Sequence, residues 1–122
     1  MVTYGIYQVT LFVQDMPKMV SFYRDVIRLT VNYPLKDDYS DEAWVTLQAG
    51  DIILALHHQG SDDYVAHAPQ LCFRVDDIEA ERERLIAAGV AVEAIIVVSP
   101  TTRFAMARDP ENNKFSIDQT TR

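Results

Sequence analysis

Two stretches of the chain repeat the same alternation of apolar and polar residues. The first covers residues 6–13 and the second residues 68–75, an offset of 62 positions. Alternation with a period of two is typical of a strand that buries one face. An aspartate follows each stretch, Asp15 in the first half and Asp77 in the second, where its carboxylate can cap the N-terminus of a helix. Both halves are therefore predicted to begin with a strand and a helix.

The spacing of apolar residues predicts these helices over 17–27 and 78–88. Gly89 is a natural C-terminal stop for the second helix. Arg28 takes the corresponding place after the first helix, where it is a poorer choice if the backbone must adopt a positive φ. Strand-like runs follow in both halves, so each half reads β-α-β-β-β. These runs cover 29–33, 43–47 and 52–57 in the first half and 90–97, 104–108 and 114–118 in the second, with turns at 49–51 and 109–113.

The whole chain, residues 1–122, is predicted to form one domain of two modules. Module 1 covers about 4–60 and module 2 about 66–119. Neither module of roughly 60 residues would bury much apolar surface alone, so we expect the two to pack together. Two polar segments, 34–42 and 59–67, are predicted loops. The acidic residues of the first lack the spacing of a calcium-binding loop, which favours a solvated loop.

Charge and cysteine usage narrow the possible partners. The chain has 11 basic and 18 acidic residues and a net charge of −7, which argues against a nucleic-acid partner. The single cysteine, Cys72, excludes an internal disulfide and favours a reducing compartment. No basic residue precedes Lys18, and no apolar run reaches the roughly 20 residues that span a bilayer. We therefore expect a cytoplasmic protein that does not bind membranes.

Three segments resemble a known superfamily in their order and content. They are Thr10-Leu11-Phe12-Val13-Gln14-Asp15-Met16, then Ser21-Phe22-Tyr23-Arg24-Asp25-Val26-Ile27, and late in the chain Ala107-Arg108-Asp109-Pro110-Glu111-Asn112-Asn113-Lys114-Phe115. With the repeat, they resemble the vicinal oxygen chelate superfamily, which includes glyoxalase I, fosfomycin- and bleomycin-resistance proteins and extradiol dioxygenases. The resemblance implies an α+β fold, in which two βαβββ modules form a U-shaped mixed sheet around a cavity with helices on the outer face. Arg28 and Asn112 replace two glycines of the pattern, and Asn tolerates the left-handed region better than Arg.

Metal-dependent members of that superfamily hold a divalent ion at four inward positions. The resemblance transfers these positions to Gln8, to Ala55 (or His57, one inward step further), to Gln70 and to Ser116. Zinc and iron sites use carboxylates, imidazoles or thiolates, and this set is mainly neutral. We therefore expect no metal site of the family type and no cofactor.

The remaining candidates would bind a small organic molecule in the cavity. The two symmetric amides would hydrogen-bond its polar edge, and aromatic side chains, Phe104 among them, would stack on a planar ligand. Basic residues would pair with an anionic group, and Arg74 and Lys114 are expected at the cavity edge. The predicted ligand-binding residues are Gln8, Thr10, Phe12, Trp44, His57, Gln70, Cys72, Arg103 and Ser116.

Each of these residues also has a structural interpretation. The two amides can bond each other or water, and the aromatic side chains can fill the core. His57 is either a general base or donor in the cavity or an ordinary histidine at a strand end. Arg103 can pair with one of the acidic residues of the chain, and Cys72 is expected to be a small buried apolar side chain.

Three functions remain open on this basis. The first is a metal-independent protein similar to the bleomycin-resistance branch, which sequesters a small molecule and acts as a homodimer. The second is an enzyme, a glyoxalase-like lyase or a fosfomycin-resistance-like transferase with an atypical metal site near Gln8 and His57. The third is a scaffold whose pocket is filled by side chains. The fold cannot separate these functions, because function depends on the site.

Overall fold

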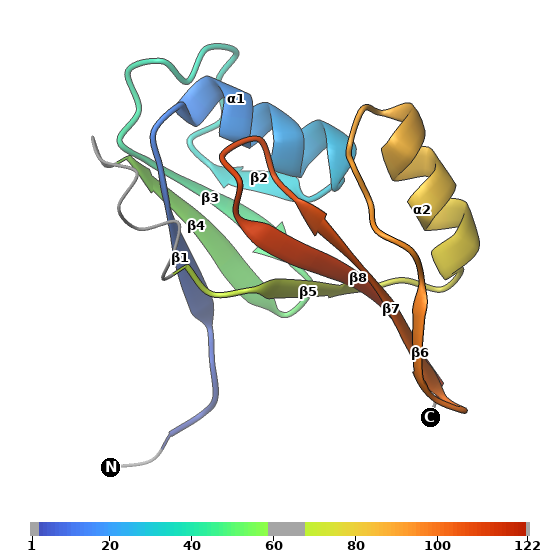
Figure 1. Ribbon diagram of the computed structural model, residues 1–122. Coiled ribbons are helices and arrows are strands. Elements are labelled where there is room, and N and C mark those ends of the chain that lie inside the picture. The colour runs from blue at the N-terminus through green and yellow to red at the C-terminus, as the bar shows by residue number, and fades with distance from the viewer. Residues whose placement is uncertain (1–2, 59–67, 122) are drawn as a thin grey trace. The chain divides into compact units, whose positions relative to one another are not determined.

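The first half of the chain forms a four-stranded mixed sheet with helices on one face. In this computed structural model, which describes residues 3–58 and 68–121, the chain divides into two compact units, Met1–Tyr64 and Val65–Arg122. The strands of unit 1 lie in the order β1-β4-β3-β2, with β1 parallel to β4 and the other neighbours antiparallel. The elements are β1 (Gln8–Val13), α1 (Met16–Ser21), the π-helix η1 (Phe22–Val26), β2 (Thr30–Tyr33), β3 (Trp44–Ala49) and β4 (Ile52–His58) (Figure 1).

The second half repeats this topology. Its strands lie in the order β5-β8-β7-β6, and β5 is parallel to β8 as β1 is to β4. The elements are β5 (Leu71–Arg74), α2 (Ile78–Ala87), β6 (Ile96–Ser99), β7 (Thr102–Arg108) and β8 (Lys114–Thr120) (Figure 1). The predicted α+β class and the two β-α-β-β-β repeats are confirmed. The predicted loop 59–67 lies outside the described residues.

Both helices begin at the aspartates that the sequence marks. Asp15 accepts a hydrogen bond from the Lys18 backbone N–H at 3.1 Å. Asp77 accepts the equivalent bond from the Ala80 N–H, also at 3.1 Å. Each carboxylate satisfies one of the backbone donors that a helix N-terminus leaves without a partner. The strand-cap-helix order is therefore fixed locally in both units.

The first predicted helix is not α-helical throughout. Its second part, η1, is a π-helix in which the Ile27 N–H donates to the Phe22 carbonyl oxygen at 3.0 Å. A π turn contains one more residue than an α turn, so two consecutive aromatic side chains can turn toward the interior. Phe22 and Tyr23 are both buried here, and their rings meet edge to face. Burial of this pair explains the difference from the predicted α-helix.

Both helices end in a residue with positive φ. Gly89, the predicted stop, has φ +91°, and Arg28 has φ +72° at the corresponding place. The Leu29 N–H donates to the Tyr23 carbonyl oxygen at 2.9 Å, which closes the helix end around Arg28. The unfavourable residue of the sequence pattern therefore adopts the left-handed conformation that glycine would adopt more easily.

The predicted strand over 90–97 is largely wrong. The structure places β6 at Ile96–Ser99, and only an isolated bridge joins Val92 to Ala107 before it. The Arg82 guanidinium of α2 donates to the carbonyl oxygens of Val92 and Glu93. These carbonyls bond to a side chain and not to a neighbouring strand, so the segment is no regular part of the sheet.

The core of each unit lies between its sheet and its helices. In unit 1 the alternate residues Leu11 and Val13 of β1 are buried, with Leu54 and Leu56 of β4 and the α1 side chains Met19 and Val20. In unit 2 Phe115 and Ile117 of β8 pack with α2, which buries Ile78 and Leu85. Within the described ranges, no helix is both long and apolar enough to cross a membrane.

Candidate functional site

The face of each sheet that points away from its helices carries most of the predicted site residues. We call it the helix-distal face. Residues directly opposite each other on paired strands point to the same side of a sheet. In unit 1 the pairs Gln8–Ile53, Thr10–Ala55 and Phe12–His57 join β1 to β4. The pair Trp44–His57 then joins β4 to β3. The register therefore places these side chains in rows on one face.

The last of these rows is an aromatic cluster. His57 lies between Phe12 on one neighbouring strand and Trp44 on the other, and both ring-centroid distances are 5.6 Å. The Trp44 indole meets the imidazole edge to face, with 68° between the ring planes. Phe12 and Trp44 keep 36% and 37% of their surface exposed, so they are not ordinary core residues. The structure thus brings together three of the predicted ligand-binding residues.

The two symmetric glutamines have the same local arrangement in both units. The Gln8 amide donates to the Thr10 hydroxyl oxygen at 3.3 Å. The Gln70 amide donates to the Cys72 sulfur at 3.8 Å and to the Met106 sulfur at 3.5 Å. Each amide nitrogen is thus held by the side chain two positions further along its own face. In both residues the amide oxygen is the group that a ligand donor would meet.

Ser116 lies on the helix-distal face of unit 2, between Cys72 of β5 and Met106 of β7. It is almost completely buried, at 1% exposure. Its hydroxyl donates to the Asp118 carboxylate at 2.5 Å, so its proton serves a contact within the strand. The predicted polar group is therefore already hydrogen-bonded.

Cys72 corrects one expectation of the sequence analysis. Its thiol is exposed, and it is not a small buried apolar group. The reason is topological, because β5 is an edge strand of its sheet and Cys72 points away from α2. Its neighbour on the other side of the strand, Phe73, contacts the Phe115 ring of the core at 6.0 Å between centroids.

Arg103 lies apart from the other candidates, on the sheet face that packs against α2. Its guanidinium forms an ion pair with Glu79 of α2 and donates to the Gln119 side chain at 3.1 Å. The hydrogen bonds from Arg103 lower the pKa of the Glu79 carboxyl, and the carboxylate raises the pKa of Arg103. The structure therefore shows Arg103 paired with an acidic residue, the alternative that its sequence left open.

The donor groups at the four metal positions of the superfamily do not fit a divalent ion. Two are glutamine amides, Ser116 donates its proton to a carboxylate, and Ala55 offers a methyl group. His57 would contribute one imidazole, but its ring lies between two apolar aromatic side chains. In the part of the chain that the structure describes, no three His, Cys, Asp or Glu residues come close enough to hold a metal. These residues give no basis for a metal-dependent step.

Sequence reasoning missed a pocket on unit 2, at the end of the sheet where β7 turns into β8. Its volume is about 430 Å³, and it is lined by Ala91, Glu93, Met106, Ala107, Arg108 and Lys114. The Glu93 N–H donates to the Met106 carbonyl oxygen at 2.8 Å, which fixes the segment before β6 beside β7. Lys114 was expected at a cavity edge, but the irregular segment that forms the other wall was predicted to be a strand.

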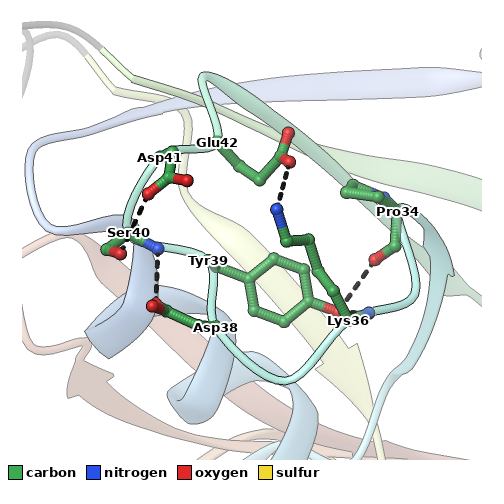
Figure 2. Close-up of polar contacts among 7 residues, drawn as sticks. All are labelled: Pro34, Lys36, Asp38, Tyr39, Ser40, Asp41 and Glu42. Atoms are coloured by element: carbon green, nitrogen blue, oxygen red, sulfur yellow. Dashed lines mark hydrogen bonds and ion pairs between the residues drawn. The ribbon is translucent and has the colours of Figure 1, made fainter.

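The loop 34–42 is more ordered than its polar composition suggests (Figure 2). Tyr39 is buried beneath it, and its hydroxyl donates to the Pro34 carbonyl oxygen at 2.8 Å. Lys36 forms an ion pair with Glu42 at 2.7 Å, and the pKa of Lys36 is raised by this contact. The predicted loop is thus anchored by one aromatic side chain that the sequence analysis left out.

The fold and this site define a class of protein before any comparison. Two α+β units with the same element order and the same strand order define a protein built from paired βαβββ modules. A family model of the Glyoxalase/Bleomycin resistance protein/Dioxygenase superfamily matches residues 5–117. The chain therefore belongs to this superfamily. No curated protein sequence matches it at a significant level.

Several solved structures share the fold. TnmS3, an antibiotic binding protein from Streptomyces sp. CB03234, is 24% identical, with 99% of each chain covered and a TM-score of 0.76. Lactoylglutathione lyase from Agrobacterium tumefaciens is 22% identical, with 96% of this chain and 94% of that chain covered and a TM-score of 0.75. The bleomycin-binding protein from Streptomyces verticillus, solved with copper(II)-bleomycin, is 22% identical over 100% of both chains, with a TM-score of 0.69. At these identities the likeness concerns the fold alone.

Proposed function

We propose that this chain is a metal-independent binding protein that sequesters a small organic molecule with a planar apolar part. The observation that carries the proposal is the Phe12–His57–Trp44 cluster. Three rings in one row present an apolar surface on a rigid sheet, and the partial exposure of Phe12 and Trp44 leaves area for a ligand to bury. Burial of roughly 100 Å² of apolar ligand surface there would contribute about 2.5 kcal/mol.

The neutral amides would provide hydrogen bonds to the polar atoms of such a ligand. Gln8 lies two rows from the cluster on the same strand, its amide nitrogen donates to Thr10, and its amide oxygen carries no charge and can accept a hydrogen bond from a ligand. A neutral group costs less to desolvate than an ion, so an apolar molecule with a few polar atoms suits such a face. Two of the structures that share the fold are named as binders of antibiotics, which agrees with sequestration.

Sequestration requires no catalytic group, and the donor set at the four family positions offers at most one of the usual metal ligands, the His57 imidazole. The lyase alternative would need a metal held near Gln8 and His57. No step through a metal follows from the groups at these positions, because amides and a methyl group do not replace carboxylates. We therefore place binding ahead of catalysis.

Trp44 provides the experiment, because it is the single tryptophan of the chain. Intrinsic fluorescence of the protein, purified without a histidine tag, would be titrated with 2-naphthamide, metal-free bleomycin and a library of planar aromatic compounds. We expect saturable quenching by at least one compound, weakened roughly tenfold in His57→Ala, in line with a loss of about 1.4 kcal/mol. Ile86→Ala removes an exposed apolar side chain on α2 and should leave binding unchanged.

Two results would overturn the proposal. One is the absence of saturable quenching with every compound tested. The other is stoichiometric micromolar binding of Zn²⁺, Ni²⁺ or Mn²⁺ in calorimetry that disappears in Gln8→Ala, which would favour the enzyme.

The proposal also includes that the protein is a homodimer and works in the cytoplasm. The dimer is supported by apolar side chains that stay exposed in groups, which monomers rarely show. They are Tyr4, Ile6 and Tyr7 before β1, and Ile96, Val97 and Val98 in β6. Sedimentation velocity over a wide concentration range would test the dimer, and a monomer throughout would exclude it.

A further inference from the structure

Two positive charges lie directly opposite each other on the pocket of unit 2. Arg108 ends β7, Lys114 begins β8, and the register pairs them across the two strands. Both residues line the pocket of about 430 Å³. Side chains paired in this way lie on the same face with their Cβ atoms roughly 5 Å apart, and like charges at such positions destabilise a sheet. The pair therefore needs an explanation.

Neither of these charges forms an ion pair with a residue in the described ranges. The Arg108 guanidinium donates to the Asn112 carbonyl oxygen at 2.9 Å, which is a neutral partner. The Lys114 ammonium forms no hydrogen bond or ion pair with any residue in the described ranges. Elsewhere in the same ranges Arg24, Lys36, Arg84 and Arg103 each pair with a carboxylate, and the chain has 18 acidic residues to supply them. This pocket thus carries positive charge in an acidic protein.

Hydrogen bonds fix the walls of the pocket. Met106 and Ala91 are apolar lining residues, and the backbone bond from Glu93 to Met106 holds the two walls together. From the other side, Arg82 of α2 donates to the Glu93 carbonyl oxygen at 2.8 Å. A ligand that enters this pocket meets walls that are held in place, so it loses less energy to their ordering.

Glu93 limits the charge of such a ligand. Glu93 lines the pocket, and among the residues that the structure describes its carboxylate has no hydrogen-bonding or ionic partner. It would repel a second negative charge on the ligand, while Arg108 and Lys114 attract the first. The lining as a whole favours a single negative charge on an otherwise apolar molecule.

We propose that this pocket binds the anionic end of a small organic monoanion, such as an aromatic carboxylate, between Arg108 and Lys114. Its apolar part lies against Met106 and Ala91. This inference goes beyond the proposed function, because the pocket belongs to unit 2 and the aromatic cluster belongs to unit 1. The Gln70 amide, which donates to the Met106 sulfur, connects the pocket to the predicted ligand-binding residues.

Methionine methyl groups provide a local test. The described methionines are Met16 and Met19, which are buried in unit 1, and Met106 at the pocket. Protein labelled with ¹³C at the methionine methyl groups would be titrated with 2-naphthoate, neutral 2-naphthamide and the dianion 2,6-naphthalenedicarboxylate. We expect 2-naphthoate to shift the Met106 signal alone, with at least roughly threefold higher affinity than the amide, as exposed charge pairs contribute up to about 1 kcal/mol.

Variants separate charge recognition from apolar contact. Lys114→Met keeps the apolar stem and should make 2-naphthoate bind no better than the amide. Glu93→Gln should strengthen binding of the dianion, because the repelling carboxylate is removed. Lys18→Met removes one positive charge from α1 in unit 1 and should change neither affinity. Since Lys114 is exposed, has no partner in the described ranges and lies opposite a like charge, its variant should melt at or above the parent temperature, which a thermal scan would check.

Equal affinity for 2-naphthoate and 2-naphthamide would overturn the inference, and so would a preference for the anion that survives in Lys114→Met. The fluorescence of Trp44 reports the other unit, so the two proposals fail independently. Quenching of Trp44 without a shift of Met106 would leave the proposed function standing and remove the anion pocket. A shift of Met106 with no compound quenching Trp44 would leave the anion pocket standing and remove the proposed function.

Discussion

The turn between β7 and β8 offers a sharp test of how the pocket residues are positioned. Asp109 is 5% exposed and accepts hydrogen bonds from the Glu111 and Asn113 backbone N–H groups, both at 2.9 Å. It also accepts two contacts from the Asn113 side-chain amide, at 2.9 and 3.1 Å. This one carboxylate thus organises the turn that places Arg108 and Lys114 opposite each other.

Asp109→Ala would remove all of these acceptors at once. A hydrogen bond to a charged group contributes about 1.5–3 kcal/mol, and contributions within one network are not additive. The buried Asn113 amide and N–H would also lose their acceptor. We expect the free energy of unfolding to fall by about 3–5 kcal/mol, a large share of the 5–15 kcal/mol typical of a domain. Asp109→Asn retains one carbonyl oxygen and should lose only about 1–2 kcal/mol.

Urea denaturation followed by circular dichroism would measure both variants. Asp38→Ala is the matched control, because the Asp38 carboxylate accepts the same kind of bond, from the Ser40 N–H at 2.9 Å, but in an exposed loop. Its effect should be far smaller, since water replaces an exposed hydrogen bond. A loss below about 1 kcal/mol in Asp109→Ala, or equal losses in Asp109→Ala and Asp38→Ala, would refute the role given to burial here.

Three further predictions concern the ends of helices, a surface ion pair and a loop anchor. In urea denaturation Arg28→Gly should stabilise the protein by about 0.5–1 kcal/mol, because Arg28 has a positive φ. Gly89→Ala should destabilise it by a similar amount for the same reason, since a Cβ at Gly89 meets no atom within 4 Å and only the backbone conformation is strained. The hydrogen bond from Arg24 lowers the pKa of Asp25, so this pair stabilises the fold above the ordinary carboxyl pKa of about 4 and the contribution is lost as the pH falls through the lowered value. The stability gap between the parent and Asp25→Asn should therefore be present at pH 7 and should shrink as the pH falls below about 4, and a gap that stays constant in acid would contradict this. Tyr39→Phe should cost about 1 kcal/mol in thermal or urea denaturation, since it removes the hydroxyl bonds of the loop (Figure 2), and an unchanged midpoint would show that only the ring matters.

The sequence predictions that the structure confirms were based on local patterns. The alternation over 6–13 predicted a strand with one buried face, and the structure buries Leu11 and Val13 while Phe12 lies on the other face. Asp15 and Asp77 cap their helices because an N-cap needs only the next three residues. The repeat also predicted equivalent positions for the two glutamines, which the structure shows. All of these features depend on contacts between residues close in the chain.

The features that failed depend on contacts between distant residues. Distant residues also decide between the two alternatives that the sequence left open for Arg103, because Glu79 lies 24 and Gln119 16 positions away. Cys72 is exposed because its strand is the edge of the sheet, which requires the strand order. The segment before β6 bonds to Arg82 instead of a strand. Pairing across the fold decides such cases, and local propensity does not.

The two units have diverged most at the rows that a ligand would meet. Each has an amide followed two residues later by a hydrogen-bond partner, but that partner is the oxygen of Thr10 in unit 1 and the sulfur of Cys72 in unit 2. Unit 1 adds an aromatic cluster, whereas unit 2 adds two cations and a carboxylate beside Met106. Like charges directly opposite each other destabilise a sheet, and exposed apolar groups commonly mark binding sites, so stability alone does not explain either feature. Two separate binding sites explain both features, an apolar one on the sheet of unit 1 and an anion-binding one on the sheet of unit 2.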